Sequence, residues 1–185
     1  MTRRLLTLFA LLPCLLLAPP ALAIEDEWSI GAGPALASLP NHENGTIGLG
    51  ASAFVRYAFT DALRGAVGLV VAHHLAAPAM DDHPDAPAFT LFIPRVGVVY
   101  AIDILDLIPY LTLDATAYFA DAAFFPDADR TMAFGMAVGL GLDYRGWRAF
   151  SIGGEVAYHA LLSDLAEYPA YLTFGLHATW HSDPF

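Results

Sequence analysis

The segment from Arg130 to Tyr144 alternates between two kinds of side chain, and this alternation constrains the fold more than any other feature. Every second residue from Met132 to Tyr144 is large and apolar, whereas the residues between them, from Thr131 to Asp143, are small or polar. A period of two residues is typical of a β-strand whose faces meet different environments. A helix would instead spread the three glycines over several faces, where each glycine costs about 1 kcal/mol.

The same alternation recurs along the chain and predicts eight strands. They are Trp28–Leu36, Thr46–Phe59, Leu63–His73, Phe89–Ile102, Pro109–Phe119, Arg130–Tyr144, Ala149–Leu161 and Tyr171–Trp180. Pro34 weakens the first prediction, because proline cannot donate a hydrogen bond to a strand ladder. The connections after the first, third, fifth and seventh strands are long, and those after the second, fourth and sixth are short, as in an up-and-down barrel.

The first 23 residues have the composition of a secretory signal peptide. Arg3 and Arg4 precede the apolar run Leu5–Leu17, and the tripeptide Ala21–Ala23 matches a small-residue cleavage site. Cys14, the only cysteine, lies inside this segment, so we expect the mature chain to lack disulfides and thiol metal sites. An uncleaved membrane anchor is the alternative, for which the apolar run is short.

The chain is very apolar, although its sequence after Ala23 shows no helical membrane span. Hydrophobic residues make up 57% of the sequence, and the mean hydropathy is +0.52. After Ala23, no apolar stretch reaches the roughly 18 residues that a membrane-crossing helix needs. A closed barrel is the other way to satisfy backbone hydrogen bonds in lipid. We therefore predict an all-β fold, an eight-stranded antiparallel transmembrane β-barrel over residues 24–180, with a short tail at 181–185.

The charge of the chain argues against a nucleic-acid partner. The formal net charge is −11, and cleavage after residue 23 would remove Arg3 and Arg4 and bring it to −13. The sequence contains no lysine, so it offers no basic patch for phosphates.

Aromatic residues gather at one end of the predicted outward rows. They are Trp28, Tyr57, Phe59, Tyr100, Tyr144, Phe150 and Trp180. Aromatic rings suit a lipid–water interface, so we predict an aromatic girdle at this rim of the barrel. The alternative is chance combined with the ordinary preference of aromatic residues for strands.

The chain resembles the small eight-stranded outer-membrane β-barrel proteins of Gram-negative bacteria, the class of the transmembrane domain of outer membrane protein A. The resemblance covers the mature chain and rests on the signal peptide, the alternation, the short turns and the aromatic-ended last strand GLHATW. It implies location in the cell outer membrane, contact with lipid, and assembly by the barrel-insertion machinery, which reads a terminal aromatic residue. Trp180 fits that signal, although residues 181–185 follow it.

Charged side chains in the predicted inward rows are candidates for an ion-pair network in the lumen. They are Arg56, Arg64, Arg95, Asp114, Asp143 and Glu155, with His159 and His177 among them. The interior of an eight-stranded barrel is only just wide enough for side chains, and buried charges must be paired. We therefore predict a filled or narrow polar lumen with a structural role in the envelope, or passage of ions and small solutes. The oligomeric state is left open.

The sequence shows no enzyme motif, and we expect neither catalysis nor a cofactor. The alternative is an outer-membrane enzyme acting on lipid A, for which His159, Ser163 and Asp164 would be base, nucleophile and acid. A binding or adhesion surface made by the outer loops is a further possibility.

A cluster of acidic residues and one histidine lies in the predicted loop between the third and fourth strands. Its members are Asp81, Asp82, His83 and Asp85. Such a set suits a divalent cation, but it lacks the spacing of a calcium loop. We expect a solvated acidic loop and no metal site.

A soluble lipocalin-like ligand-binding barrel is the alternative fold. It would place the apolar rows inside and the small and polar rows in water. The predicted inward rows are rich in glycine and contain no lysine, which is unlike a solvent-facing surface.

Overall fold

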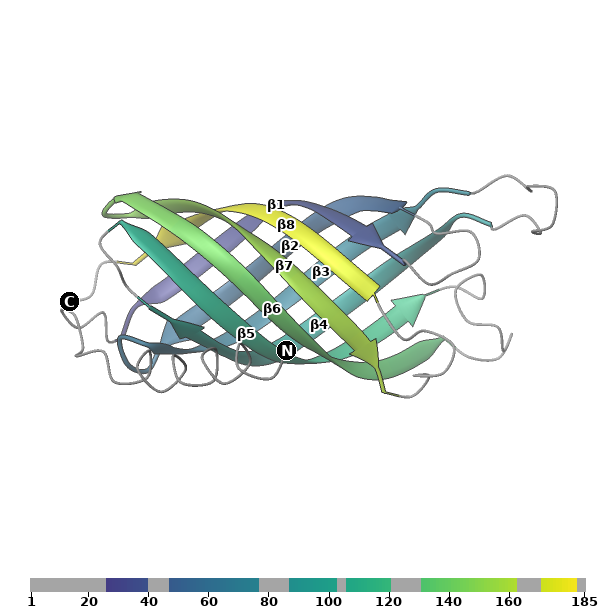
Figure 1. Ribbon diagram of the computed structural model, residues 1–185, viewed down its shortest axis with the longest axis horizontal. Helices are drawn as coiled ribbons and strands as arrows, with labels where there is room; N and C mark the ends of the chain where they lie inside the picture. The colour runs from purple at the N-terminus through teal and green to yellow at the C-terminus, as the bar shows by residue number, and fades with distance from the viewer. Residues whose placement is uncertain are drawn as a thin grey trace, which may run out of the picture.

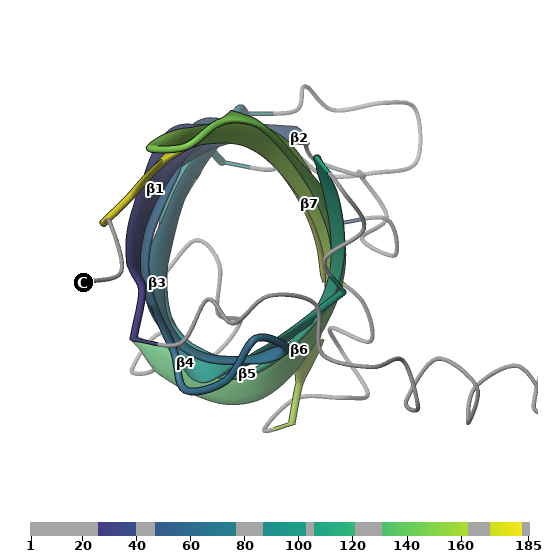
Figure 2. The same ribbon diagram turned by 90° about the vertical axis from the view of Figure 1, so that its left-hand side faces the viewer.

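The structure, a computed structural model, describes residues 26–39, 47–76, 87–102, 106–120, 131–162 and 171–182. Its strands are β1 (Trp28–Ser38), β2 (Ile47–Ala58), β3 (Leu63–His74), β4 (Phe89–Ala101), β5 (Leu107–Ala120), β6 (Met132–Trp147), β7 (Phe150–Leu161) and β8 (Tyr171–His181). Each strand pairs antiparallel with the next, and β8 pairs with β1, so the sheet closes into a barrel (Figures 1 and 2). The predicted eight-stranded antiparallel barrel is confirmed.

The strands differ from the predicted ranges only at their ends. β5 begins at Leu107, and β8 continues past Trp180 to His181, because the alternation of inward and outward residues continues there. β6 extends to Trp147, although we predicted a turn over residues 145–148. The pairing of β6 with β7 shifts register between Tyr144 and Trp147. Such an irregularity lets a strand continue with a stronger twist, so the turn is displaced to residues 148 and 149.

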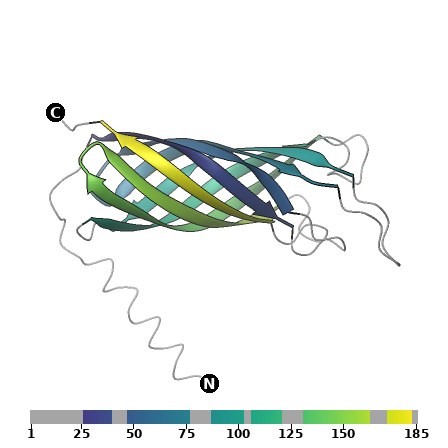
Figure 3. The same ribbon diagram turned by 90° about the horizontal axis from the view of Figure 1, so that it is seen from above.

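Two prolines lie within strands at places where pairing on one side is interrupted. Pro34 is paired with Ala51 of β2, while the pairing of β1 with β8 omits it. Pro94 is likewise paired with Leu69 of β3, and the pairing of β4 with β5 omits it. A proline has no N–H to donate, so each ring is tolerated where no donor is required. Pro34 therefore does not end β1, which runs beside β8 (Figure 3).

The alternation sorts the side chains into an apolar outer wall and a lumen. On β6, the large residues from Met132 to Tyr144 are 38–68% exposed, whereas Ala133, Ala137 and Asp143 between them are at most 2% exposed. The large apolar residues thus face outward, which is the opposite of what a soluble lipocalin-like barrel requires. An outward apolar surface this extensive is typical of a transmembrane β-barrel.

The lumen has an apolar part and a charged part. We call the end with the β2–β3, β4–β5 and β6–β7 connections the turn end, and the opposite end the loop end. Apolar side chains, among them Leu91, Ile93, Leu161 and Tyr171, fill the lumen toward the loop end. The charged side chains lie nearer the turn end, together with a smaller apolar cluster of Val99, Ala101, Ile108 and Tyr110. Within the described ranges, no helix is long and apolar enough to span a membrane.

Candidate functional site

Arg56 reaches across the lumen from β2 to carboxylates on the far wall. Its Nη1 lies 3.5 Å from Oδ2 of Asp143 on β6, and its Nη2 lies 3.4 Å from Oε2 of Glu155 on β7. The guanidinium also lies 4.0 Å from the ring centre of Phe54 and 4.6 Å from that of Tyr110. These contacts join opposite walls of the barrel through its interior.

Arg95 makes a second crossing from β4. Its Nη1 contacts Oε1 of Glu155, and the same nitrogen lies 3.5 Å from Oδ2 of Asp114 on the neighbouring strand β5. Glu155 is therefore shared between arginines that come from two different strands. Asp114 and Glu155 are buried and the Arg95 side chain is only 9% exposed, so each charge depends on its partners for the stabilisation that water would otherwise give.

His177 joins this network through Asp143. Its Nε2 lies 2.7 Å from Oδ1 of Asp143, and its ring packs edge-on against Phe54 with centres 5.1 Å apart. We call Arg56, Arg95, Asp114, Asp143, Glu155 and His177 the lumen network. Two predicted members, His159 and Arg64, lie outside it.

Among the described residues, His159 contacts hydroxyl groups and no carboxylate. Its Nδ1 lies 3.1 Å from the hydroxyl of Tyr118, and its Nε2 lies 2.9 Å from Oγ1 of Thr173. The ring is fully buried. Ser163 and Asp164, the other members of the alternative catalytic set, lie outside the described residues.

Arg64 points into the lumen and is 3% exposed. Among the described residues it forms no ion pair, and its Nε and Nη2 have no hydrogen-bond partner. It is therefore a buried cation that the lumen network does not include.

A second polar cluster lies at the turn end. It was not predicted from the sequence. Oε2 of Glu27 lies 2.7 Å from Nη2 of Arg145, and Oε1 of Glu27 lies 2.9 Å from Nδ1 of His181. Nε2 of His181 lies 2.9 Å from Oγ of Ser151. We call these four residues the rim cluster. Ser29 and Thr179 are inward residues, and Glu27 and His181 lie two positions beyond them. Extending the alternation by two residues at these strand ends would therefore have placed both ionisable side chains in the lumen.

The rim cluster keeps Glu27 ionised despite its burial. Burial raises the pKa of the Glu27 carboxyl, but hydrogen bonds from His181 and Arg145, together with their charges, outweigh it and hold the pKa below its ordinary value of 4.5. A carboxylate only accepts hydrogen bonds, so Nδ1 of His181 carries the proton.

His74, near the loop end, was also missed. Its ring stacks on Phe89 with centres 4.5 Å apart, and its Nε2 lies 3.2 Å from the hydroxyl of Tyr171. Val70, Ala72 and His74 are alternate residues of β3 and all face the lumen. Extending the alternation past Ala72 would therefore have predicted that His74 faces the lumen as well.

The residues predicted for the aromatic girdle lie on the outer wall toward the turn end. The exposed ones are Trp28, Phe59, Tyr144, Phe150 and Trp180, and the half-buried ones are Tyr57 and Tyr100. Trp147, which is 59% exposed, lies with them but was assigned to a turn in the sequence. Neighbouring rings touch, with the centres of Trp28 and Tyr57 4.8 Å apart.

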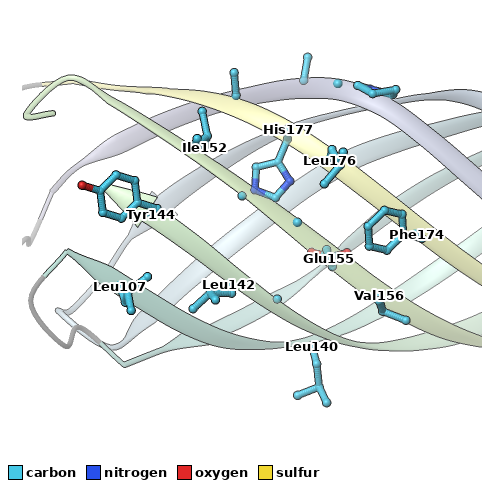
Figure 4. A pocket seen from close by; sticks show the side chains of 17 residues that line it. Leu107, Leu140, Leu142, Tyr144, Ile152, Glu155, Val156, Phe174, Leu176 and His177 are labelled. Atoms are coloured by element: carbon cyan, nitrogen blue, oxygen red, sulfur yellow. The ribbon is translucent and has the colours of Figure 1, made fainter. Parts of the chain in front are cut away.

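A groove of about 920 Å³ runs over the outer wall across β6, β7, β8 and β1 (Figure 4). Its apolar lining includes Leu142, Ile152, Phe174 and Leu176. Gly154 pairs with Leu142 on one side and with Leu176 on the other. Because a glycine has no side chain, the space between these two leucines stays open and forms part of the groove. Most of its lining belongs to the apolar outer wall, and Glu155 and His177 of the lumen network also line it.

Within the described ranges, no group of three or more His, Cys, Asp or Glu residues is placed to hold a metal ion. The acidic set Asp81, Asp82, His83 and Asp85 lies outside those ranges, as does the predicted signal peptide at residues 1–23.

Comparison with solved structures identifies the fold. OprG, an outer membrane protein from Pseudomonas aeruginosa, matches with a TM-score of 0.61 at 12% identity, over 86% of this chain and 97% of that one. The N-terminal β-barrel domain of OprF from the same organism gives a TM-score of 0.58 at 13% identity, over 85% and 98%. Neisserial surface protein A gives a TM-score of 0.57 at 18% identity, over 87% and 98%. The fold is that of the small outer-membrane β-barrels.

No protein-family model matches the chain, and no curated protein matches its sequence.

Proposed function

We propose that this chain is an outer-membrane β-barrel protein with a filled polar lumen and a structural role in the envelope. The observation that carries the proposal is the pair of crossings in the lumen. Arg56 from β2 and Arg95 from β4 both meet Glu155 on β7, so charged side chains span the space that a pore would need.

Little free space remains beside these crossings. The hollow between Arg95, Glu155, Thr173 and His177 holds about 10 Å³, which is close to the least volume that one water molecule needs. Toward the loop end, apolar side chains such as Leu91 fill the lumen. This packing supports a plug more strongly than a continuous channel.

The outer wall supports a place in the outer membrane. Its large apolar residues would contact lipid, and the aromatic rings at the turn end would lie at one lipid–water interface. Export by the segment at residues 1–23, and assembly by the barrel-insertion machinery through Trp180, belong to the same proposal. We propose no catalytic role, because both ring nitrogens of His159 are engaged with hydroxyl groups.

Heat modifiability tests the barrel in lipid. The mature protein, extracted into mild detergent, should migrate differently on an SDS gel before and after boiling, because a closed barrel stays folded in cold SDS. A protein that showed no shift and stayed soluble without detergent would contradict the outer-membrane assignment.

Conductance in planar bilayers then separates a plug from a pore. The wild type should conduct little. Arg95→Ala removes one crossing and should raise the conductance, while the control Arg148→Ala removes an exposed arginine from the β6–β7 turn and should change nothing. Steady conductance by the wild type would favour the alternative of ion or small-solute passage.

A further inference from the structure

In the ring of described strands, β1 and β8 are the neighbouring pair that no stretch of chain joins. Every other pair consists of consecutive strands, so a turn or loop connects its members. β8 ends and β1 begins at the turn end, where turns connect β2 to β3, β4 to β5 and β6 to β7 (Figure 1). The seam between β1 and β8 therefore lacks a covalent link at the end where these other pairs have one.

The hydrogen-bonded ladder of this seam is divided into two segments. The turn-end segment pairs residues 29–32 with residues 178–181, and the loop-end segment pairs residues 35–38 with residues 172–175. The ladder omits the residues between them, among which Pro34 has no N–H to donate. The β4–β5 ladder is interrupted in the same way, but a turn joins those strands. In the seam, each segment therefore depends on its own contacts to stay closed.

Side-chain and backbone contacts extend the turn-end segment beyond its last residue pair. Oε1 of Glu27, which precedes β1, lies 2.9 Å from Nδ1 of His181 at the end of β8. The N–H of Trp28 donates to Oγ of Ser182 over 2.9 Å, and the N–H of Ser182 donates to the carbonyl of Trp28 over 2.8 Å. The carbonyl of Glu27 also accepts a hydrogen bond from the N–H of Ala58 on β2. Glu27 is therefore held to β2 through its backbone and to β8 through its side chain.

The loop-end segment has no comparable contacts. Among the described residues, no side-chain hydrogen bond or ion pair joins β1 to β8 there, and Oγ1 of Thr173 contacts His159 on β7 instead. Ala35 and Ala37 of β1 pack into the apolar part of the lumen. Because these side chains are small, they bury little apolar surface.

We propose that the rim cluster links β8 to β1 in place of the missing turn, and that the loop-end segment of the seam opens independently of it. Arg145 of β6 and Ser151 of β7 hold Glu27 and His181 from the neighbouring strands, so the link is anchored to the rest of the wall. The proposal requires only the closed barrel and is independent of the role proposed above.

Hydrogen exchange of the wild type, refolded from residue 24 onward into detergent and resolved by NMR, compares the two segments without any substitution. The exchange rate of an amide that opens locally reports the free energy of that opening. Amides that bond across the seam should therefore exchange about tenfold more slowly in the turn-end segment than in the loop-end segment. Equal rates, or slower exchange in the loop-end segment, would overturn the proposal.

Glu27→Gln keeps the size of the side chain but removes the charge that strengthens its hydrogen bonds. It should raise the exchange rates of the turn-end segment by about tenfold and leave those of the loop-end segment unchanged. Asp114→Asn is the matched control, because Asp114 is also 2% exposed but contacts Arg95 on β4 and lies away from the seam. An equal increase in both segments for Glu27→Gln, or the same increase in the turn-end segment for Asp114→Asn, would contradict the proposed link.

A disulfide across the seam tests whether the rim cluster acts as a link. Ile30 and Trp180 are paired residues of the outer row in the turn-end segment. Such partners have Cα atoms about 4.5–5.5 Å apart, which a disulfide can span. Ile30→Cys with Trp180→Cys supplies the only two cysteines of a protein that begins after Cys14. Glu27→Gln should speed exchange in the turn-end segment when this pair is reduced and should have no effect when it is oxidised. An effect that persisted in the oxidised protein would overturn the proposal.

Discussion

Nε2 of His177 lies 2.7 Å from Oδ1 of Asp143, and the residue between them is Gly153. Gly153 pairs with Asp143 on β6 and with His177 on β8. A Cβ atom at Gly153 would overlap the Asp143 carboxylate and would also crowd Nε2 of His177. The contact between the two side chains therefore exists because the strand between them carries no side chain at that position.

Gly153→Ala should destabilise the barrel by about 1–3 kcal/mol, because the added methyl group overpacks a buried polar contact. Urea unfolding in lipid vesicles, followed by tryptophan fluorescence, measures the change. The matched control is Gly154→Ala on the outer wall, where the nearest atoms to a new Cβ are 3.3 Å away. Equal losses in the two variants would show that the Asp143–His177 contact does not set the requirement for glycine.

The contact between Arg95 and Glu155 should show strong coupling in a double-mutant cycle. Arg95→Met removes the arginine that contacts Asp114 and leaves Glu155 with Arg56 alone, whereas Glu155→Gln leaves Arg95 with Asp114 and Arg56 with Asp143. Breaking a buried ion pair costs about 3–5 kcal/mol. The double variant removes both charges, so its loss should be smaller than the sum of the single losses by about 1–3 kcal/mol. Additive losses in the unfolding free energy would mean that the two side chains do not stabilise one another.

The rim cluster should make the barrel sensitive to acid through Glu27. Its pKa is lower in the folded state than its ordinary value of 4.5, so its contribution to stability is complete above that pH. The contribution is lost as the pH falls through the folded-state pKa, because the carboxyl group then becomes protonated. Glu27→Gln removes the titrating group and should reduce stability by about 1–3 kcal/mol at neutral pH.

The comparison of wild type and Glu27→Gln across pH checks this linkage. The difference in unfolding free energy should be largest near neutral pH and should shrink at acidic pH. A difference that stayed constant with pH would show that Glu27 stabilises the rim by packing and not by its charge.

All three tryptophans should report on one membrane interface. Trp28, Trp147 and Trp180 are exposed on the outer wall toward the turn end. Lipids brominated near the headgroup should therefore quench the fluorescence of the wild type more than lipids brominated deep in the acyl chain. In a tryptophan-free background, Val138→Trp places the probe in the middle of β6 and should show the reverse order. The same order for both proteins would contradict the depth assigned to the girdle.

The alternation alone predicted the strands, their order around the barrel and the side of the wall that each residue faces. It succeeded because the period of two is a local property of the backbone, and because the outer wall carries large apolar side chains while the inner wall carries many small and polar ones. Pro34 illustrates the strength of this pattern. The alternation of the first strand placed Pro34 correctly on the outer face, although the lack of an N–H group in proline argued against a strand there.

The prediction from the sequence was wrong at the ends of some strands. Glu27 lay outside the first predicted strand and His181 outside the last one, because a boundary drawn from composition stops before the last inward residue. Trp147 was assigned to a turn because a register shift in the β6–β7 pairing cannot be read from either strand alone. Tertiary pairing decides how far such a strand continues.

The composition of the lumen was thus determined by the sequence, but the partners within it were decided only by the tertiary structure. Inward arginines and carboxylates can be counted from the alternation, and the counts suggest complete pairing. Which charges meet depends on the stagger of strands around the closed barrel. This stagger brings Arg56 and Arg95 to Glu155 and leaves Arg64 without a carboxylate partner among the residues that the structure describes. That stagger is a property of the whole ring of strands, so no single segment of the chain encodes it.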